Sequence, residues 1–182
     1  GGGGVGGRGP GGVVGLRGVL HRRVGSEGRA RTPRLRPVRL AAGALGAGLP
    51  RRDLCVSRQH RMLVRSGIAK RMFGGMGVLA SAARLTELPG VGLDEEAGEV
   101  EYFHLVLARH EVIFAEGAPT ESFLLTAEPR AGLPASQRVA PKQSGALEGA
   151  IAKAPAAPIP PPAQQREMVA RHARNARQLL AL

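Results

Sequence analysis

Residues 100–114 read VEYFHLVLARHEVIF, and this stretch carries the clearest β-strand pattern of the chain. Side chains alternate between the two faces of a strand. One face would carry Val100, Tyr102, His104 and Val106, and the other Phe103, Leu105 and Leu107. Because both faces are largely apolar, we predict a strand that is buried on both sides. Residues 108–111 predict a turn that holds His110, and residues 112–114 predict a returning strand, so the stretch is interpreted as a hairpin.

Weaker patterns on either side predict further elements. Residues 53–64 favour a strand, a turn and a second strand, because Leu54 and Val56 alternate with polar residues and the apolar run resumes at Met62. The other predictions are an extended segment at 37–40, a small-residue loop at 43–50, a strand with a short helix over 78–88, and a turn at 116–120. The chain is therefore predicted to be mainly β.

The aromatic residues indicate where a core would lie. The chain contains four phenylalanines, one tyrosine and no tryptophan. All of them fall between Phe73 and Phe123. Since aromatic side chains bury large apolar areas, we expect the core to be centred on this region.

Charge is unevenly distributed along the 182 residues. The formal net charge is +12, from 26 Lys+Arg against 14 Asp+Glu. Residues 1–52 carry +10, residues 53–130 carry −3, and residues 131–182 carry +5. The basic character therefore belongs to the two flanks, and a folded middle region would be mildly acidic.

The flanks differ from the middle in composition as well. Residues 1–28 contain 13 glycines, whose ordering costs much backbone entropy, so we expect 1–34 to be a disordered Gly/Arg segment. Two explanations stand for it: a GC-rich coding stretch, which we favour, or an Arg/Gly arm that binds nucleic acid. We assign 35–128 to one domain and 129–163 to an Ala/Pro-rich linker.

Residues 164–182 predict a basic C-terminal helix. Its apolar stripe would consist of Val169, Ala173, Ala176 and Leu180. Arginines occupy the rest of its circumference. We favour a solvated helix with a weak apolar stripe, and an acidic partner or nucleic acid is the alternative.

Several classes of protein are excluded. With Cys55 as its single cysteine, the chain has no intrachain disulfide framework and no Cys-rich zinc site. No run of about 18 apolar residues is present, so a membrane-spanning helix is not expected. The first residues do not resemble a signal peptide, and nothing in the sequence indicates a compartment. His104, His110 and Glu111 match no zinc-ligand spacing, and neither a metal nor another cofactor is expected.

Two stretches together resemble a known family. Residues 37–64 and 100–123 resemble the second half of bacterial Hint (hedgehog/intein) domains, and residues 170–175 look like the C-terminal extension of such proteins. Ser57-x-x-His60 is similar to the family's Thr-x-x-His motif, and the run from His110 to Gly117 is similar to its later motif. The resemblance implies part of a Hint-type β-horseshoe.

The resemblance also implies self-catalysed rearrangement of a peptide bond in the chain's own upstream polypeptide. In such an N-to-S or N-to-O acyl shift, a Cys or Ser attacks the preceding carbonyl, and a second nucleophile resolves the resulting ester. His60 would protonate the departing nitrogen, and the Ser57 hydroxyl would lie beside the same peptide. His110, and less clearly His104, would assist the resolving step. His104 fits a structural hydrogen bond equally well.

The sequence departs from the family pattern at the nucleophile. Nothing in residues 1–36 resembles the segment that opens such a domain, and Cys55 and Ser26 do not replace it. We therefore expect this polypeptide to lack self-cleavage, as a chain truncated at its N-terminus or as a decayed copy. Its end also lacks the terminal His-Asn of a splicing intein.

A second function class remains open. The chain could instead be a basic interaction protein that binds nucleic acid or an acidic surface, although we consider nucleic acid the weaker candidate. The expected assembly state is a monomer.

Overall fold

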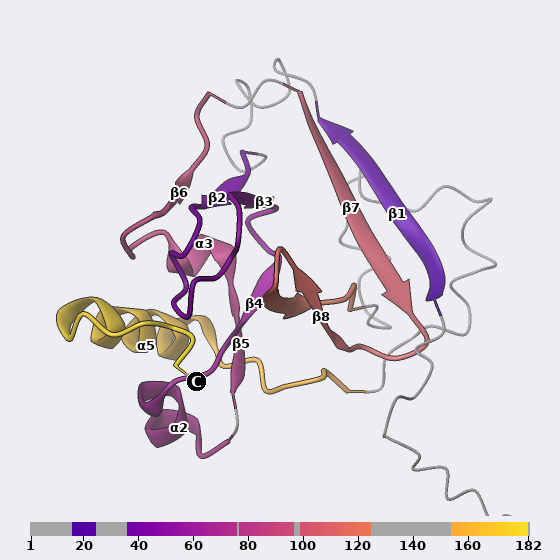
Figure 1. Ribbon diagram of the computed structural model, residues 1–182. Helices are drawn as coiled ribbons and strands as arrows, with labels where there is room; N and C mark the ends of the chain where they lie inside the picture. The colour runs from indigo at the N-terminus through magenta and orange to yellow at the C-terminus, as the bar shows by residue number, and fades with distance from the viewer. Residues whose placement is uncertain (1–15, 25–35, 76, 97–98, 125–153, 182) are drawn as a thin grey trace, which may run out of the picture.

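The computed structural model describes residues 16–24, 36–75, 77–96, 99–124 and 154–181. Its elements, labelled as in Figure 1, are β1 (Leu16–Val24), β2 (Val38–Leu40), β3 (Leu54–Val56), β4 (Arg61–Val64), α2 (Gly67–Phe73), β5 (Val78–Ser81), α3 (Ala82–Leu85), β6 (Val91–Leu93), β7 (Val100–Leu107), β8 (Val112–Ala115), β9 (Ala118–Glu121) and α5 (Pro162–Arg174). None of the described helices is long and apolar enough to cross a membrane.

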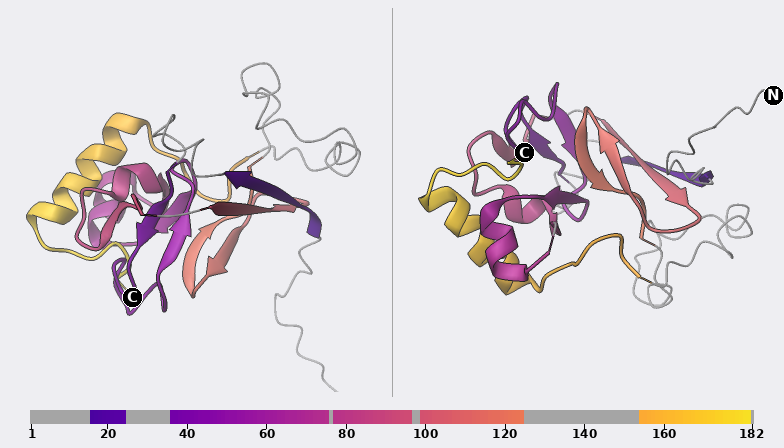
Figure 2. Two further views of the ribbon diagram at one scale, coloured as in Figure 1. Left: turned by 90° about the horizontal axis from the view of Figure 1, so that it is seen from above. Right: turned by 60° about the horizontal axis from the view of Figure 1, so that its bottom comes forward.

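The strands form three antiparallel sheets. The largest has the order β5-β4-β9-β8, a second has the order β3-β2-β6, and β1 pairs with β7 in a two-stranded ribbon. Helices α2, α3 and α5 gather on one side of the molecule, and the ribbon lies at the opposite end (Figure 2). The prediction of a mainly β chain with a C-terminal helix is confirmed.

The core is aliphatic and lies mostly outside the predicted aromatic region. Its largest fully buried hydrophobic side chains are Val38, Leu40, Leu45, Met62, Val64, Val78, Leu79, Leu85, Val106, Met168 and Leu179. Among the aromatic residues, Phe103 and Phe114 remain 60% and 72% exposed. The expectation that the core is centred on residues 73–123 is therefore wrong, because aliphatic and methionine side chains from before and after this region fill much of the space between sheets and helices.

The predicted hairpin over 100–114 is also wrong. Strand β7 pairs with β1, and β8 pairs with β9. The hairpin turn is formed by Glu116 and Gly117, whose φ angles of 50° and 78° suit the two central positions of a tight two-residue turn. Residues 108–111 instead connect the ribbon to the large sheet.

Strand β7 is buried on one face along most of its length, and on the other face only at its end, where Leu107 is buried. Tyr102 and Val106 are buried, whereas Phe103 and Leu105 are exposed. The ribbon of β1 and β7 is covered mainly on one face, so the prediction that the strand over 100–107 is buried on both sides is wrong.

Strand β1 lies inside the segment that we expected to be disordered. Glycine is concentrated before it, and the strand itself, LRGVLHRRV, contains a single glycine. Its backbone pairs with β7 from Leu16↔Leu107 to Val24↔Val100. The composition of the whole segment concealed this strand; the rest of 1–34 lies outside the described residues.

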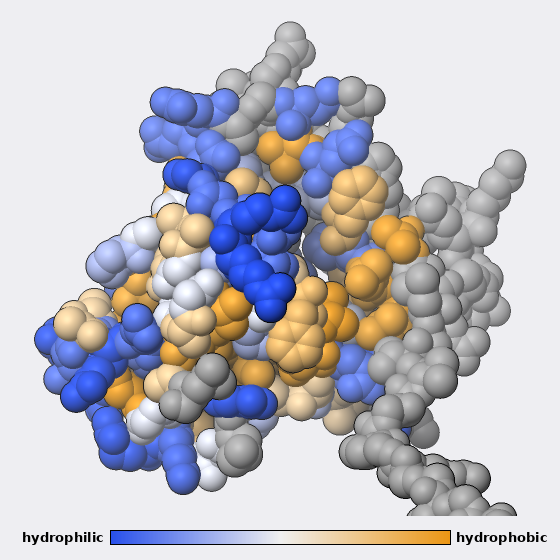
Figure 3. Space-filling model, viewed as in Figure 1, coloured by the Kyte–Doolittle hydropathy of each residue, from blue (hydrophilic) through white to orange (hydrophobic). Residues whose placement is uncertain are grey.

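Helix α5 is part of the fold rather than a solvated appendage. It begins at Pro162, ends at Arg174, and buries Gln165, Met168, Val169 and His172. Of the predicted stripe, Val169 is buried in the helix, Ala173 is exposed, and Ala176 and Leu180 lie beyond its end. Its outer face is mostly hydrophilic (lower left in Figure 3).

The C-terminal residues lie between the loop at Leu45 and Arg65, which directly follows β4. Leu180 N donates to Leu45 O at 2.8 Å, and Leu180 forms a parallel bridge with Arg65. At Gly46, with φ +99°, a Cβ atom would lie 2.8 Å from Leu180 O, so only glycine fits where the tail passes.

Candidate functional site

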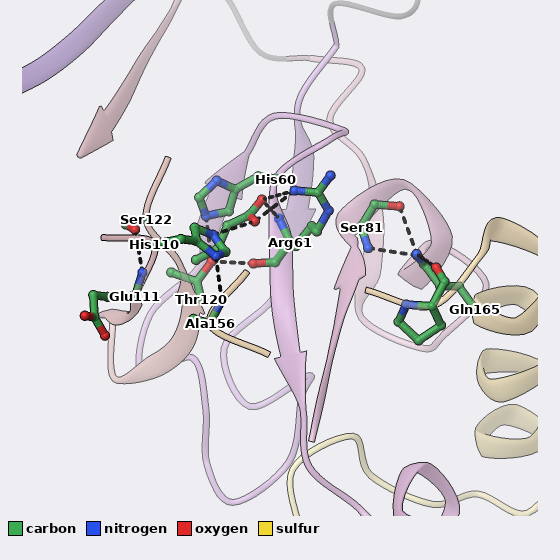
Figure 4. A network of polar contacts seen from close by, with 11 residues as sticks. His60, Arg61, Ser81, His110, Glu111, Thr120, Ser122, Ala156 and Gln165 are labelled. Atoms are coloured by element: carbon green, nitrogen blue, oxygen red, sulfur yellow. Dashed lines mark hydrogen bonds and ion pairs between the residues drawn. The ribbon is translucent and has the colours of Figure 1, made fainter. Parts of the chain in front are cut away.

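His60 is held at the start of β4 by a turn. Its N–H donates to Ser57 O at 3.0 Å, and its own carbonyl accepts from Ala82 N at 2.8 Å. Strand β9 lies beside β4, with Met62 opposite Thr120. This register places the Thr120 hydroxyl 2.6 Å from His60 Nε2 (Figure 4).

The hydrogen bonds of Thr120 fix the proton on His60. The Thr120 hydroxyl donates to Arg61 O at 2.8 Å, because a carbonyl oxygen can only accept. The hydroxyl oxygen therefore accepts from His60 Nε2–H. No described residue hydrogen-bonds the second nitrogen, Nδ1, which keeps its lone pair in this tautomer.

Burial lowers the pKa of His60 to about 4, and the nearby His104 and Arg61 act in the same direction, while Glu121 opposes the shift. The ring is therefore neutral at physiological pH. This corrects one expectation, since a resting neutral imidazole must first accept a proton before it can deliver one.

Arg61 and Glu121 form a partly buried ion pair beside His60. Arg61 Nη1 lies 2.9 Å from Glu121 Oε2, and Arg61 N donates to Glu121 Oε1 at 2.9 Å. Burial by itself raises the pKa of Glu121, but the hydrogen bond with His110 and the charge of Arg61 outweigh it and hold this pKa below its ordinary value. The carboxylate is thus ionised and anchors both β4 and the loop before β8.

His110 joins the same network, but neither of its nitrogens is open. Ala156 N donates to Nδ1 at 2.9 Å, and Nε2 lies 3.2 Å from Glu121 Oε2. The His110 side chain has no exposed surface. An imidazole whose Nδ1 accepts carries its proton on Nε2, so His110 donates to Glu121.

His104 reaches the site from β7. Its ring centroid lies 6.0 Å from that of His60 and 5.3 Å from that of Phe123. Phe123 N donates to Leu105 O at 2.8 Å, which ties the end of β9 to the ribbon. The structure thus brings His60, His104 and His110 into one region, linked through β9.

Ser57 and Cys55 lie at the margin of this region. Ser57 contributes its carbonyl to the turn that holds His60, and its hydroxyl makes no hydrogen bond to a described residue. Cys55 is exposed, with Sγ 3.8 Å from Asp94 Oδ2. Partial burial and this carboxylate raise the pKa of the thiol, so Cys55 is not an activated nucleophile.

Three residues of the network were not predicted: Arg61, Thr120 and Glu121. A polar run, Thr120-Glu121-Ser122, stands between Pro119 and Phe123 in an otherwise apolar region, and all three polar side chains are buried. Buried polar groups must be paired. That run was therefore a usable signal that the partners of nearby histidines would lie there. Among the described residues, no group of three or more His, Cys, Asp or Glu side chains could hold a metal ion.

Comparison with sequence families identifies the domain family to which this chain is similar. The model of the Hint domain matches residues 9–127. The matched range starts before β1 and ends shortly after β9. Comparison with curated proteins and with solved structures finds no match.

Proposed function

Because this chain belongs to the Hint domain family, whose members act on their own polypeptide, we propose that it carries the acid–base site of an acyl shift at a peptide bond. The bond lies in the same polypeptide. A cysteine or serine at the scissile junction attacks the preceding carbonyl, and the amide becomes a thioester or ester. The site that supports this proposal is centred on His60.

The observation that carries the proposal is the open Nδ1 of a neutral His60. Nδ1 takes the proton of the attacking thiol or hydroxyl. The ring is then an imidazolium with a low pKa, which makes it a strong proton donor. It returns the proton to the departing amide nitrogen, and no other acid or base is consumed. One imidazole therefore serves as base and then as acid.

The neighbouring residues position His60. Thr120 accepts from Nε2–H and so leaves the lone pair on Nδ1, while the Arg61–Glu121 pair holds the residue whose carbonyl accepts from Thr120. His110, with both nitrogens engaged, supports Glu121 and does not itself exchange protons with substrate. We assign His110 a positioning role in place of the direct role expected from the sequence.

Two further assignments follow from placement. His104 shares the region of His60 and supplies the second imidazole for the resolving step. The Ser57 hydroxyl, on the turn that holds His60, is assigned the carbonyl oxygen of the scissile peptide as its partner, as the motif suggests.

The proposed reaction needs a nucleophile that the described residues do not supply. Cys55 is protonated and paired with Asp94, and it lies on β3 rather than at a junction. We propose that the chain as given does not cleave itself and becomes competent when a segment with a junction Cys or Ser precedes it.

A fusion protein tests the proposal. A reporter followed by a Cys-opened N-terminal segment of a Hint domain is joined ahead of the full chain, and reporter release is followed with and without dithiothreitol. We expect release that depends on the thiol and disappears in the His60→Ala fusion. A folded fusion that releases no reporter, or an equal rate in His60→Ala, would overturn the proposal.

The matched control is His172→Ala. His172 is another buried histidine that hydrogen-bonds a hydroxyl, but it lies between α5 and α2, away from the site. We expect this variant to retain the release rate of the parent fusion per folded molecule. Circular dichroism establishes folding for each fusion.

A further inference from the structure

We propose that residues 154–160, which lie beyond the family match and lead into α5, are a working part of the site and act through the backbone amide of Ala156 on His110. Its effect on cleavage rests on the proposed function, whereas its effect on the His110 ring does not. The match ends at residue 127, so nothing in the family comparison assigns a role to this segment.

The contact between the segment and the site is a single directed hydrogen bond. Ala156 N–H donates to His110 Nδ1 at 2.9 Å. A backbone amide can only donate, so this nitrogen must hold its lone pair. The proton is therefore confined to Nε2, which lies 3.2 Å from Glu121 Oε2.

The amide is held in place on its C-terminal side by a clamp around Gln165. Pro158 O accepts from Leu79 N at 2.9 Å on β5. The side chain of Gln165 accepts from Ser81 N at 3.1 Å and donates to Pro160 O at 2.7 Å. The segment that carries Ala156 is thus fastened along β5 before α5 begins (Figure 4).

Helix α5 and the chain end secure the segment further. Met168 and Val169 are fully buried in the core. After the helix, Arg65 N donates to Leu179 O at 2.9 Å, and Ala181 N donates to Arg65 O at 2.9 Å. Displacing Ala156 for long therefore requires the release of several buried contacts.

A continuous chain of contacts leads from Ala156 to the reactive nitrogen. His110 donates to Glu121, Glu121 binds the backbone N–H and guanidinium of Arg61, and the Arg61 carbonyl receives the Thr120 hydroxyl that orients His60. Without the Ala156 amide, nothing requires a lone pair on Nδ1, so the ring proton is no longer confined to Nε2 and the Nε2–H bond to Glu121 is weakened. The site is therefore complete only after the C-terminal segment has docked.

This order has a consequence for timing during synthesis. The strands that carry His60 and Thr120 leave the ribosome well before residues 154–181. We therefore expect the site to reach its reactive geometry only when the end of the chain has been made. Premature cleavage of a nascent chain would be suppressed.

The test removes one hydrogen-bond donor. Ala156→Pro deletes the N–H, and Ala157→Pro is the matched control, because no hydrogen bond of Ala157 N is found among the described residues. The nitrogen-15 resonances of the His110 ring, assigned with His110→Gln, report the tautomer in the chain as it stands. We expect a proton confined to Nε2 in the parent chain and in Ala157→Pro. In Ala156→Pro, the two ring-nitrogen shifts move toward each other.

Unchanged ring shifts in a folded Ala156→Pro overturn the inference, whatever the fusion does. If Ala156→Pro fails to fold, Gln165→Ala, which removes the clamp, gives the same readout by letting the segment lift. In the fusion, we expect Ala156→Pro to slow release about tenfold or more, because small misplacements of catalytic groups are costly. A changed tautomer with an unchanged release rate would overturn the link to the site while leaving the His110 contact intact.

Discussion

Two hydroxyl–imidazole pairs in this molecule look alike but differ in direction. Thr120 Oγ1 lies 2.6 Å from His60 Nε2, and Ser66 Oγ lies 2.8 Å from His172 Nε2. His172 Nδ1 lies 2.8 Å from Met168 O, so it must donate there, and Nε2 accepts from Ser66. At His60 the proton is on Nε2 instead, and the lone pair of Nδ1 stays open.

The difference separates the histidine that we propose to react from one that only stabilises the fold. Both rings are neutral, because burial lowers the pKa of each, although for His172 the bond to Met168 partly opposes the shift. His172 uses both nitrogens to fasten α5 to the start of α2, where Ser66 also accepts from Ala69 N. His60 keeps one nitrogen for another molecule or segment. The partners of the hydroxyl thus decide what each imidazole can do.

Removing each ring gives the largest contrast. In the fusion, His60→Ala should lower the release rate by about 100- to 10,000-fold, the range for lost acid–base catalysis. His172→Ala should leave that rate within about twofold but reduce the free energy of unfolding by about 2–4 kcal/mol, because it empties a buried, paired position. Release kinetics and urea unfolding measure the two effects. A large loss of rate in folded His172→Ala would remove the distinction between the pairs.

Acid should weaken the fold through His60 first. Its pKa is about 4 in the folded chain against an ordinary 6.5. As the pH falls below 6.5, His60 becomes protonated in the unfolded chain but stays neutral in the folded chain. The free energy of unfolding therefore decreases until about pH 4, where the folded chain is protonated as well. We expect a loss of about 2 kcal/mol between pH 7.5 and pH 5 from this group.

Urea unfolding at these two pH values measures the loss. His60→Gln should reduce it, whereas His172, whose pKa is shifted in the same direction, should still contribute its share. Equal pH dependence in the parent chain and His60→Gln would show that His60 is not buried as a neutral ring.

Removing the hydroxyls should have smaller and unequal effects. Thr120→Val leaves His60 Nε2–H and the Arg61 carbonyl unpaired, so we expect a loss of about 1–3 kcal/mol. Ser66→Ala removes a helix cap and should cost about 1 kcal/mol. Thr120→Ser should recover most of the loss. Thermal unfolding of the three variants compares them.

The smallest effect should come from the outer face of α5. Glu167 pairs with Arg171 at 2.8 Å on a half-exposed surface. Such pairs contribute little, so Glu167→Ala should change the free energy of unfolding by at most about 0.5 kcal/mol. A larger loss in urea unfolding would mean that α5 is held by its charges as well as by its buried face.

The sequence predicted local elements better than their partners. The alternation at Leu54 and Val56 identified β3, the apolar run that begins at Met62 identified β4, and the Thr-x-x-His-like motif pointed to His60. The turn at 116–120 was predicted, but the longer apolar run at 100–114 suggested that the hairpin lay one element earlier, between 100–107 and 112–114. Pairing between distant strands, such as β1 with β7, leaves no local pattern.

The site was predicted in part for the same reason. Histidines stand out in a sequence because few other side chains titrate near neutral pH. Thr120 and Glu121 do not stand out, because their importance depends on the register that places β9 beside β4. The open nitrogen of His60 depends in turn on where one hydroxyl proton points, and only the fold determines that.

Gly46 contributes to the site only indirectly, through the path that it leaves for the C-terminal residues. The missing side chain at Gly46 leaves the passage through which Gln178 and Leu180 run. Any larger residue there would expel the tail and, with it, the anchorage of α5. The φ of +99° at Gly46 disfavours any side chain even without the tail, so a compensating change in the last residues should not rescue a substitution there.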